Sequence, residues 1–123
     1  MRLRAIIACT AILVCSSLHA RTRRHPHPAQ VFQATAYTRQ AVTASGVEAR
    51  SGLVAADPAV LPLGSRIQVS NAGTYSGVYT VADTGSKVLG RHIDIFMHSR
   101  TRAKVFGKKF VVVQVLRRGP PRG

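Results

Sequence analysis

The chain has 123 residues, a length that fits a single domain. Its 18 Lys and Arg against 4 Asp and Glu give a formal net charge of +14 at pH 7, so it is expected to associate with polyanions. Both cysteines, Cys9 and Cys15, lie near the amino terminus. Their position excludes a disulfide framework, a thiol nucleophile and a cysteine metal site from the rest of the chain.

Residues 1–20 have the organisation of a secretory signal peptide. Arg2 and Arg4 precede the apolar run Ala5–Cys15, and small residues follow up to Ala20. The run is shorter than the ~20 residues needed to cross a bilayer, so no transmembrane segment is expected in the mature chain. Two other readings are a buried apolar helix and a lipoprotein anchor at the second cysteine. We therefore predict an exported protein of the periplasm, cell wall or extracellular space.

Two basic, proline-broken segments, residues 21–30 and 117–123, flank the foldable part. Their composition predicts a disordered arm and a disordered tail. Such arms would bind anionic wall polymers or lipid headgroups. His25 and His27 could contact a metal, but two histidines in a flexible arm are expected to be solvated. The sequence predicts no metal site and no cofactor.

Between these segments the pattern indicates short strands separated by turns. β-Branched and aromatic residues, alternation and turn residues predict the strands, and residues 39–52 form a long loop. The expected strands are residues 31–38, 53–56, 65–70, 78–82, 92–97 and 110–116. The last is almost continuously apolar, which predicts burial on both faces.

One helix is expected, over Ser99–Phe106. Ser99 is suited to capping its start and Gly107 its end. Six short strands and one short helix predict a mainly β fold over residues 31–116. A closed barrel is favoured because closure leaves no exposed strand edges.

Acidic residues are scarce beyond the signal peptide, which leaves Glu48, Asp57, Asp83 and Asp94. A surface tuned for solubility mixes both signs of charge. The scarcity therefore favours a specific role for each aspartate. Asp57 and Asp83 both occur in turn-like contexts, where an aspartate also commonly binds its own backbone, and this alternative stays open for both.

Asp94 is not in a turn, because it lies between Ile93 and Ile95 in a predicted strand. Period-two geometry puts the isoleucines on one face and Asp94 on the other, with His92 and Phe96. If the isoleucines fill the core, Asp94 faces an outer groove beside an exposed aromatic ring. Sugar-binding sites often have that composition.

The motifs in this order resemble the 3D domain, which is named for three aspartates and occurs in the membrane-bound lytic transglycosylase A family and in small wall-associated proteins. The resemblance covers roughly residues 33–116. The matching residues are Ala36–Thr38, Thr43–Gly46, Val54–Pro58, Leu61–Gly64, Asp83–Gly85, Gly90, Ile93–Phe96 and Ala103–Gly107. The sequence departs from the family pattern at Ser86 and Leu89.

The resemblance implies a six-stranded double-psi β-barrel and peptidoglycan as the substrate. In the enzymatic members, the aspartate that matches Asp94 is the catalytic acid and base. Those that match Asp57 and Asp83 shape and polarise the site. The predicted substrate-binding residues are Tyr37, Thr38, Thr84, Gly85, Lys87 and Phe96.

A lytic transglycosylase needs one carboxyl group, whereas ordinary glycosidases use two. The acid protonates the leaving glycosidic oxygen, and the resulting carboxylate takes the proton of the sugar's own 6-hydroxyl. Burial and neighbouring carboxylates would raise the pKa of such an acid, whereas Lys87 and Arg91 would lower it. The sequence leaves the balance open.

Three other functions remain to be weighed. The same barrel occurs in non-catalytic glycan-binding and wall-loosening proteins, the expansin and rare lipoprotein A groups. Val81–Ser86 resembles the signature of small dimeric aspartic proteases, but the accompanying apolar-apolar-Gly segment follows at once instead of dozens of residues later. Specific nucleic-acid binding is not expected in an exported protein whose basic helix has only Arg100, Arg102 and Lys104.

Overall fold

The computed structural model describes residues 27–38, 44–46 and 51–121. The predicted signal peptide, His25, Glu48 and most of the predicted long loop lie outside these residues. Within them, no helix is long and apolar enough to span a membrane. The regular elements are β1 (Gln30–Tyr37), β2 (Leu53–Ala56), β3 (Arg66–Ser70), the 3-10 turn η1 (Gly73–Tyr75), β4 (Gly77–Asp83), β5 (His92–Phe96), α1 (Arg100–Phe106) and β6 (Lys109–Arg117).

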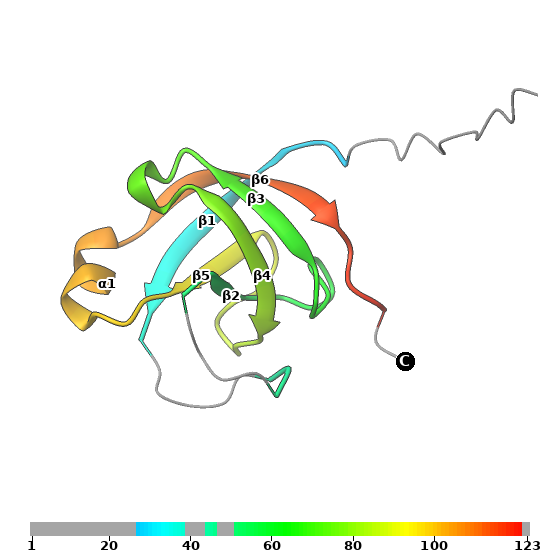
Figure 1. The fold of residues 1–123 in the computed structure, drawn as a ribbon, viewed down its shortest axis with the longest axis horizontal. Helices are drawn as coiled ribbons and strands as arrows, with labels where there is room; N and C mark the ends of the chain where they lie inside the picture. Colours follow the sequence, from blue (N-terminus) through cyan, green and yellow to red (C-terminus); the bar gives the residue numbers. More distant parts are fainter. Residues whose placement is uncertain (1–26, 39–43, 47–50, 122–123) are drawn as a thin grey trace, which may run out of the picture.

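The six strands form a closed barrel in the order β1-β5-β2-β4-β3-β6 (Figure 1). Two pairs are parallel, β1 with β5 and β2 with β4, and the other four are antiparallel. Closure gives every strand two hydrogen-bonded neighbours, so no strand edge is left unpaired. The mainly β fold class, a six-stranded double-psi barrel with one short helix, is confirmed.

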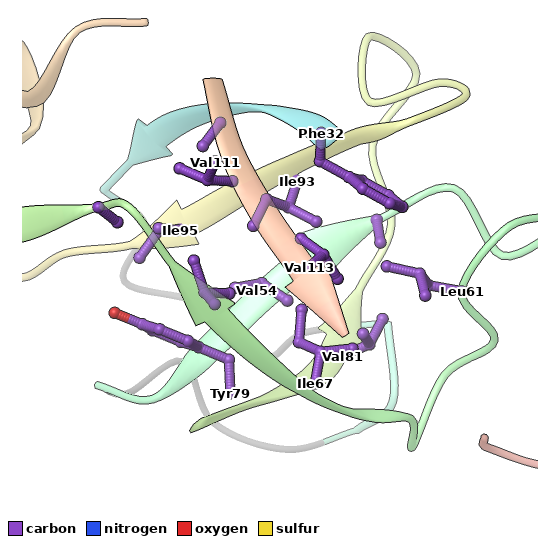
Figure 2. Close-up of a cluster of buried hydrophobic side chains, with 14 of the residues drawn as sticks. Phe32, Val54, Leu61, Ile67, Tyr79, Val81, Ile93, Ile95, Val111 and Val113 are labelled. Carbon is purple, nitrogen blue, oxygen red and sulfur yellow. The ribbon is translucent and has the colours of Figure 1, made fainter. Parts of the chain in front are cut away.

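The barrel interior is the hydrophobic core (Figure 2). Every strand contributes side chains to it, and most are β-branched, which suits a pleated and half-buried surface. The largest fully buried side chains include Val54, Leu61, Ile67, Val81, Ile93, Ile95, Val111 and Val113. Since the chain beyond residue 20 has no cysteine, this packing has to stabilise the fold without disulfides.

The predicted alternation of β5 is confirmed, because Ile93 and Ile95 are buried in the core while Asp94 is half-buried on the outer face. The prediction that β6 is buried on both faces was wrong. Only its inward residues, Val111 and Val113, are buried, and Phe110 is 69% exposed. The barrel wall is a single layer of strands, and among the described residues no element covers the outer face of β6 at Phe110.

The predicted helix forms with both predicted caps. Ser99 Oγ accepts a hydrogen bond from the Arg102 amide at 3.2 Å. Gly107 has a φ of 63°, and its amide donates to the Ala103 carbonyl at 3.2 Å. Phe106 is buried and packs edge-to-face against Tyr75, with ring centroids 5.5 Å apart. These contacts fix α1 against one end of the barrel.

The carboxyl-terminal tail differs from the disordered segment expected there. Arg117 is the last residue of β6, and Gly119 is buried. The Gly119 amide donates to Ser65 Oγ at 2.8 Å. A Cβ atom at position 119 would overlap the Leu63 carbonyl oxygen. The described part of the tail is therefore held to the barrel at Gly119, a position that only glycine can occupy.

Candidate active site

Two of the three aspartates lie on either side of strand β2. Ala55 is the register partner of Asp94 in the antiparallel β2–β5 pair. The same Ala55 is the partner of Asp83 in the parallel β2–β4 pair. The two carboxylates thus come from different strands at the same level of the barrel, with only a methyl side chain between them.

A β-bulge places Asp83 in this row. Val54 pairs with Val81, but the next residue, Ala55, pairs with Asp83, so Ala82 is skipped. Regular alternation after the fully buried Val81 would turn Asp83 toward the barrel interior. The extra residue brings the Asp83 carboxylate to the outer face instead. Bulges commonly re-aim side chains in this way next to functional sites.

Asp94 lies beside strand β1, where its register partner is Thr35. The Thr35 hydroxyl donates to Asp94 Oδ1 at 3.0 Å. Burial raises the pKa of Asp94, the hydrogen bond from Thr35 and the nearby His92 lower it, and the charge of Asp83 raises it again. The net result is a raised pKa, so this carboxyl binds a proton at higher pH than an ordinary aspartate does.

Asp83 is only 3% exposed and is held by several donors. Its Oδ1 accepts from the Thr84 amide at 2.9 Å and from the Ala44 amide at 3.0 Å. The Tyr37 hydroxyl donates to Oδ2 at 3.4 Å. Buried carboxylates require such partners. Asp83 thereby joins the turn at residues 44–46 to the end of β4, and it contributes negative charge beside Asp94.

Asp57 plays a different part, at the turn that follows β2. Its Oδ1 accepts from the Ala59 amide at 3.0 Å, and its Oδ2 accepts from the Gly90 amide at 2.9 Å. The bond from Gly90, followed by that from Ala59, lowers the pKa of Asp57. Asp57 therefore ties the chain before β5 to its own turn. This contact agrees with the turn alternative for this residue.

Replacing Asp57 by Asn is expected to destabilise the fold at neutral pH, because the amide presents an N–H to one of the two backbone donors. A carboxyl whose pKa is lowered by folding stabilises the native state above its ordinary pKa, and this stability is lost as the pH falls through the lowered value. The difference between wild type and Asp57→Asn in thermal unfolding should thus shrink in acid. An equal difference at all pH values would contradict this role.

The aromatic part of the prediction needs correction. Phe96 is not an exposed ring, since it is only 5% exposed and clusters with Leu53 and Ala82. Its ring packs edge-on against Tyr37 at 5.6 Å and against His98 at 5.0 Å between centroids. Register pairs Tyr37 with Phe96 across β1 and β5. Phe96 therefore supports the half-buried Tyr37. The Tyr37–Phe96 pair lies two residues along β1 and β5 from the Thr35–Asp94 pair.

The remaining predicted substrate-binding residues differ in their exposure. Thr84 and Gly85 are half-buried directly after Asp83, while Thr38 and Lys87 are exposed. Within the described residues, no hydrogen bond or ion pair joins Thr38 or Lys87 to the carboxylates. Within the described ranges, no group of three His, Cys, Asp or Glu is arranged to hold a metal ion.

Two depressions adjoin the aromatic pair. One of about 170 Å³ lies beside Phe96 and is lined also by Tyr75, His98 and Arg102. A wider one, of about 400 Å³, lies beside Tyr37 and is lined also by Arg100 and Lys104 of α1. Both depressions thus adjoin the Tyr37–Phe96 pair and have basic side chains of α1 in their walls, while Asp57, Asp83 and Asp94 line neither of them.

Sequence reasoning missed Thr35 and the bridging position of Ala55. Thr35 lies within the predicted first strand, but its role depends on the pairing of β1 with β5, which are far apart in the chain. Period-two alternation puts Thr35 on the same face as Tyr37, and this was the one available signal. The same alternation puts His92 on the face of Asp94, but the sequence assigns it no role in the site.

The chain is similar to several proteins of Bacillus subtilis strain 168. It is 39% identical over 92 residues to the "Cell wall-binding protein YocH", which covers 68% of this chain and 31% of that protein. It is 32% identical over 107 residues to the "Putative cell wall shaping protein YabE", covering 79% of this chain and 25% of the relative. The chain thus spans about a third or less of the length of these two relatives.

The fold is similar to that of MltA from E. coli. One crystal structure of MltA matches with a TM-score of 0.53 at 19% identity, over 66% of this chain and 28% of that one. Another, described as revealing "a unique lytic transglycosylase fold", also gives 0.53 at 23% identity, over 67% and 29%. These likenesses establish the fold alone. The sequence model of the 3D domain family matches residues 52–117 of this chain. This range includes all three aspartates of the barrel, and the chain therefore belongs to the 3D domain family.

Proposed function

We propose that the protein is exported and acts on peptidoglycan as a minimal lytic transglycosylase, with Asp94 as its acid and base. The observation that carries this proposal is the half-buried Asp94, whose pKa is raised and whose Oδ1 alone is occupied by a protein donor among the described residues. The wall-related names of YocH and YabE support the substrate class and a location at the cell wall. The barrel shared with MltA supports the reaction class.

The reaction requires one carboxyl group. Asp94, in its protonated form, gives its proton to the glycosidic oxygen between MurNAc and GlcNAc as the C1–O bond breaks. The resulting carboxylate takes the proton of the MurNAc 6-hydroxyl as O6 bonds to C1. The product carries a 1,6-anhydro ring, Asp94 is protonated again, and no water is consumed. A raised pKa suits this acid step, because the group has to hold a proton near the working pH.

The other two aspartates are suited to support rather than proton transfer. Both carboxylate oxygens of Asp57 and of Asp83 already accept hydrogen bonds from protein donors. Asp83 raises the pKa of Asp94 through its charge. In this proposal Tyr37 and the residues after Asp83, Thr84 and Gly85, contact the glycan. Lys87 and Thr38 lie at the periphery, and Phe96 acts through Tyr37.

Replacing Asp83 by Asn should move the alkaline limb of the pH–rate profile to lower pH. Activity falls as the pH rises through the pKa of Asp94, since the acid must be protonated. Removing the negative charge of Asp83 lowers that pKa, while Thr35 and His92 still act on Asp94 as before. The Asn oxygen can keep the two amide bonds made by Oδ1. The pH dependence of kcat/KM measures the limb, and an unmoved limb would contradict coupling between the two aspartates.

The test of the proposal is the release of soluble muropeptides from purified sacculi by the wild-type protein and by Asp94→Asn. Release by the wild type alone supports the enzyme. The competing function is a non-catalytic wall-binding module, favoured by the +14 charge and by the name of YocH. Sedimentation of a folded protein with sacculi, with no released product over a range of pH, would support that module and overturn the enzyme.

A further inference from the structure

A hydrogen-bonded chain of three side chains joins strands β1 and β5 behind the proposed acid. Thr35 Oγ1 lies 3.0 Å from Asp94 Oδ1 and 2.8 Å from His92 Nε2. All three side chains are half-buried on the outer face of the barrel. The pairing of the strands, Thr35 with Asp94 and Gln33 with His92, holds them at adjacent positions. Thr35 is therefore fixed between the two titratable groups.

The proton count of this chain allows two directions, and each fixes the tautomer of His92. A threonine hydroxyl has one proton to donate and two lone pairs that accept. In the first direction that proton goes to Asp94 Oδ1, which accepts it. The contact of 2.8 Å between Thr35 Oγ1 and His92 must then be donated by the ring nitrogen. In this direction His92 carries a proton on Nε2.

The same count decides where the proton of the acid is held. When Oδ1 accepts from Thr35, the carboxyl proton of Asp94 belongs on Oδ2, to which no donor among the described residues is directed. In the reverse chain, Nε2 of His92 would accept from Thr35 and Thr35 would accept from Oδ1–H. The acid proton would then point at β1 and away from a substrate.

We propose that His92 is a positioning residue that, through Thr35, keeps the acid proton of Asp94 on Oδ2, the oxygen that faces the glycan. The role of Asp94 as an acid rests on the proposed lytic function, but the location of the protons on Asp94, Thr35 and His92 does not. The proposal needs no change in the charge of His92 during the reaction. What matters is that Nε2 remains a donor, so that the Thr35 hydroxyl stays turned toward Asp94.

The proton positions can be read directly by nuclear magnetic resonance of the purified protein. Long-range correlations between the ring nitrogens and the carbon-bound ring protons give the nitrogen chemical shifts, which distinguish a protonated from an unprotonated Nε2 in each histidine. We expect a protonated Nε2 for His92 in the wild type and in Thr35→Ser, which keeps the hydroxyl. In Thr35→Val the ring should become a mixture of tautomers. His98, whose ring packs on Phe96, is the internal control and should not change. An unprotonated Nε2 in the wild type would overturn the proposal.

Kinetics on sacculi give the second readout. His92→Gln keeps an N–H donor, whereas His92→Phe removes it. We expect kcat to fall roughly tenfold in His92→Phe with KM unchanged, and to stay close to wild type in His92→Gln. Thr35→Val should cost as much as His92→Phe, and the double variant should lose no more than either one, because the residues act as one unit. Equal kcat in His92→Phe and wild type, from folded proteins, would overturn the proposal.

The two proposals fail in different ways. A wild type that releases no product but shows the Thr35-dependent proton on His92 Nε2 would contradict the lytic function and support the proton arrangement. A wild type that is active and whose His92 tautomer does not respond to Thr35→Val would leave the lytic function standing and overturn the role of His92.

Discussion

Replacing Asp94 by Asn should abolish turnover on sacculi and leave binding to them unchanged. The amide cannot give a proton to the glycosidic oxygen or take one from the 6-hydroxyl, and loss of a general acid costs on the order of 10²–10⁴ in rate. The substitution is isosteric, and the Asn oxygen can still accept from the Thr35 hydroxyl. Release of soluble product and cosedimentation with sacculi measure the two properties separately.

The same variant is expected to be more stable than the wild type at neutral pH. Folding raises the pKa of Asp94, so its contribution to stability is present below the ordinary pKa of an aspartate and is lost as the pH rises through the raised value. A neutral Asn avoids this cost. The midpoint of thermal unfolding of Asp94→Asn should be higher than that of wild type at neutral pH, and the difference between the two should narrow in acid. This result would show that the variant loses turnover without losing its fold. Turnover equal to wild type would contradict the assignment of Asp94.

The largest loss of stability is expected from a core substitution in β3, the strand opposite β5 in the barrel. Ile67 of β3 is fully buried, and Figure 2 shows it among the core side chains. Ile67→Ala should lower the free energy of unfolding by about 2–5 kcal/mol, through lost burial and the cavity left behind. That is a large share of the ~5–15 kcal/mol typical of a small domain. Denaturant unfolding measures it.

Phe110→Ala is the matched control for Ile67→Ala. Phe110 is a large apolar residue of the neighbouring strand β6, but it is 69% exposed. Its removal should change the free energy of unfolding by less than about 0.5 kcal/mol, as for most surface substitutions. Similar losses in the two variants would contradict the one-sided burial of β6.

The elements that the sequence predicted are those with local signals. The alternation around Asp94 predicted both β5 and the face on which its carboxylate lies. The caps Ser99 and Gly107 predicted the bounds of α1. Such signals involve residues a few positions apart, so the backbone geometry of one segment is enough to interpret them.

The parts that were missed depend on contacts between distant segments. The row from Thr35 through Asp94 and Ala55 to Asp83 exists because β5 and β2 lie between β1 and β4 in the barrel. The bulge at Ala82 that re-aims Asp83 has no marker such as glycine or proline at that residue. The burial of Phe96 likewise comes from β1, β2 and β4. Pattern alone could not supply these pairings.

The central claim, that this barrel cleaves glycan strands without water, is tested most directly by the chemistry of the new ends. Sacculi would be digested with the purified protein in water labelled with heavy oxygen, and the soluble fragments analysed by mass spectrometry. We predict fragments that end in 1,6-anhydro-MurNAc, one water lighter than a reducing end and free of the label. Labelled reducing ends would show hydrolysis and would contradict the account.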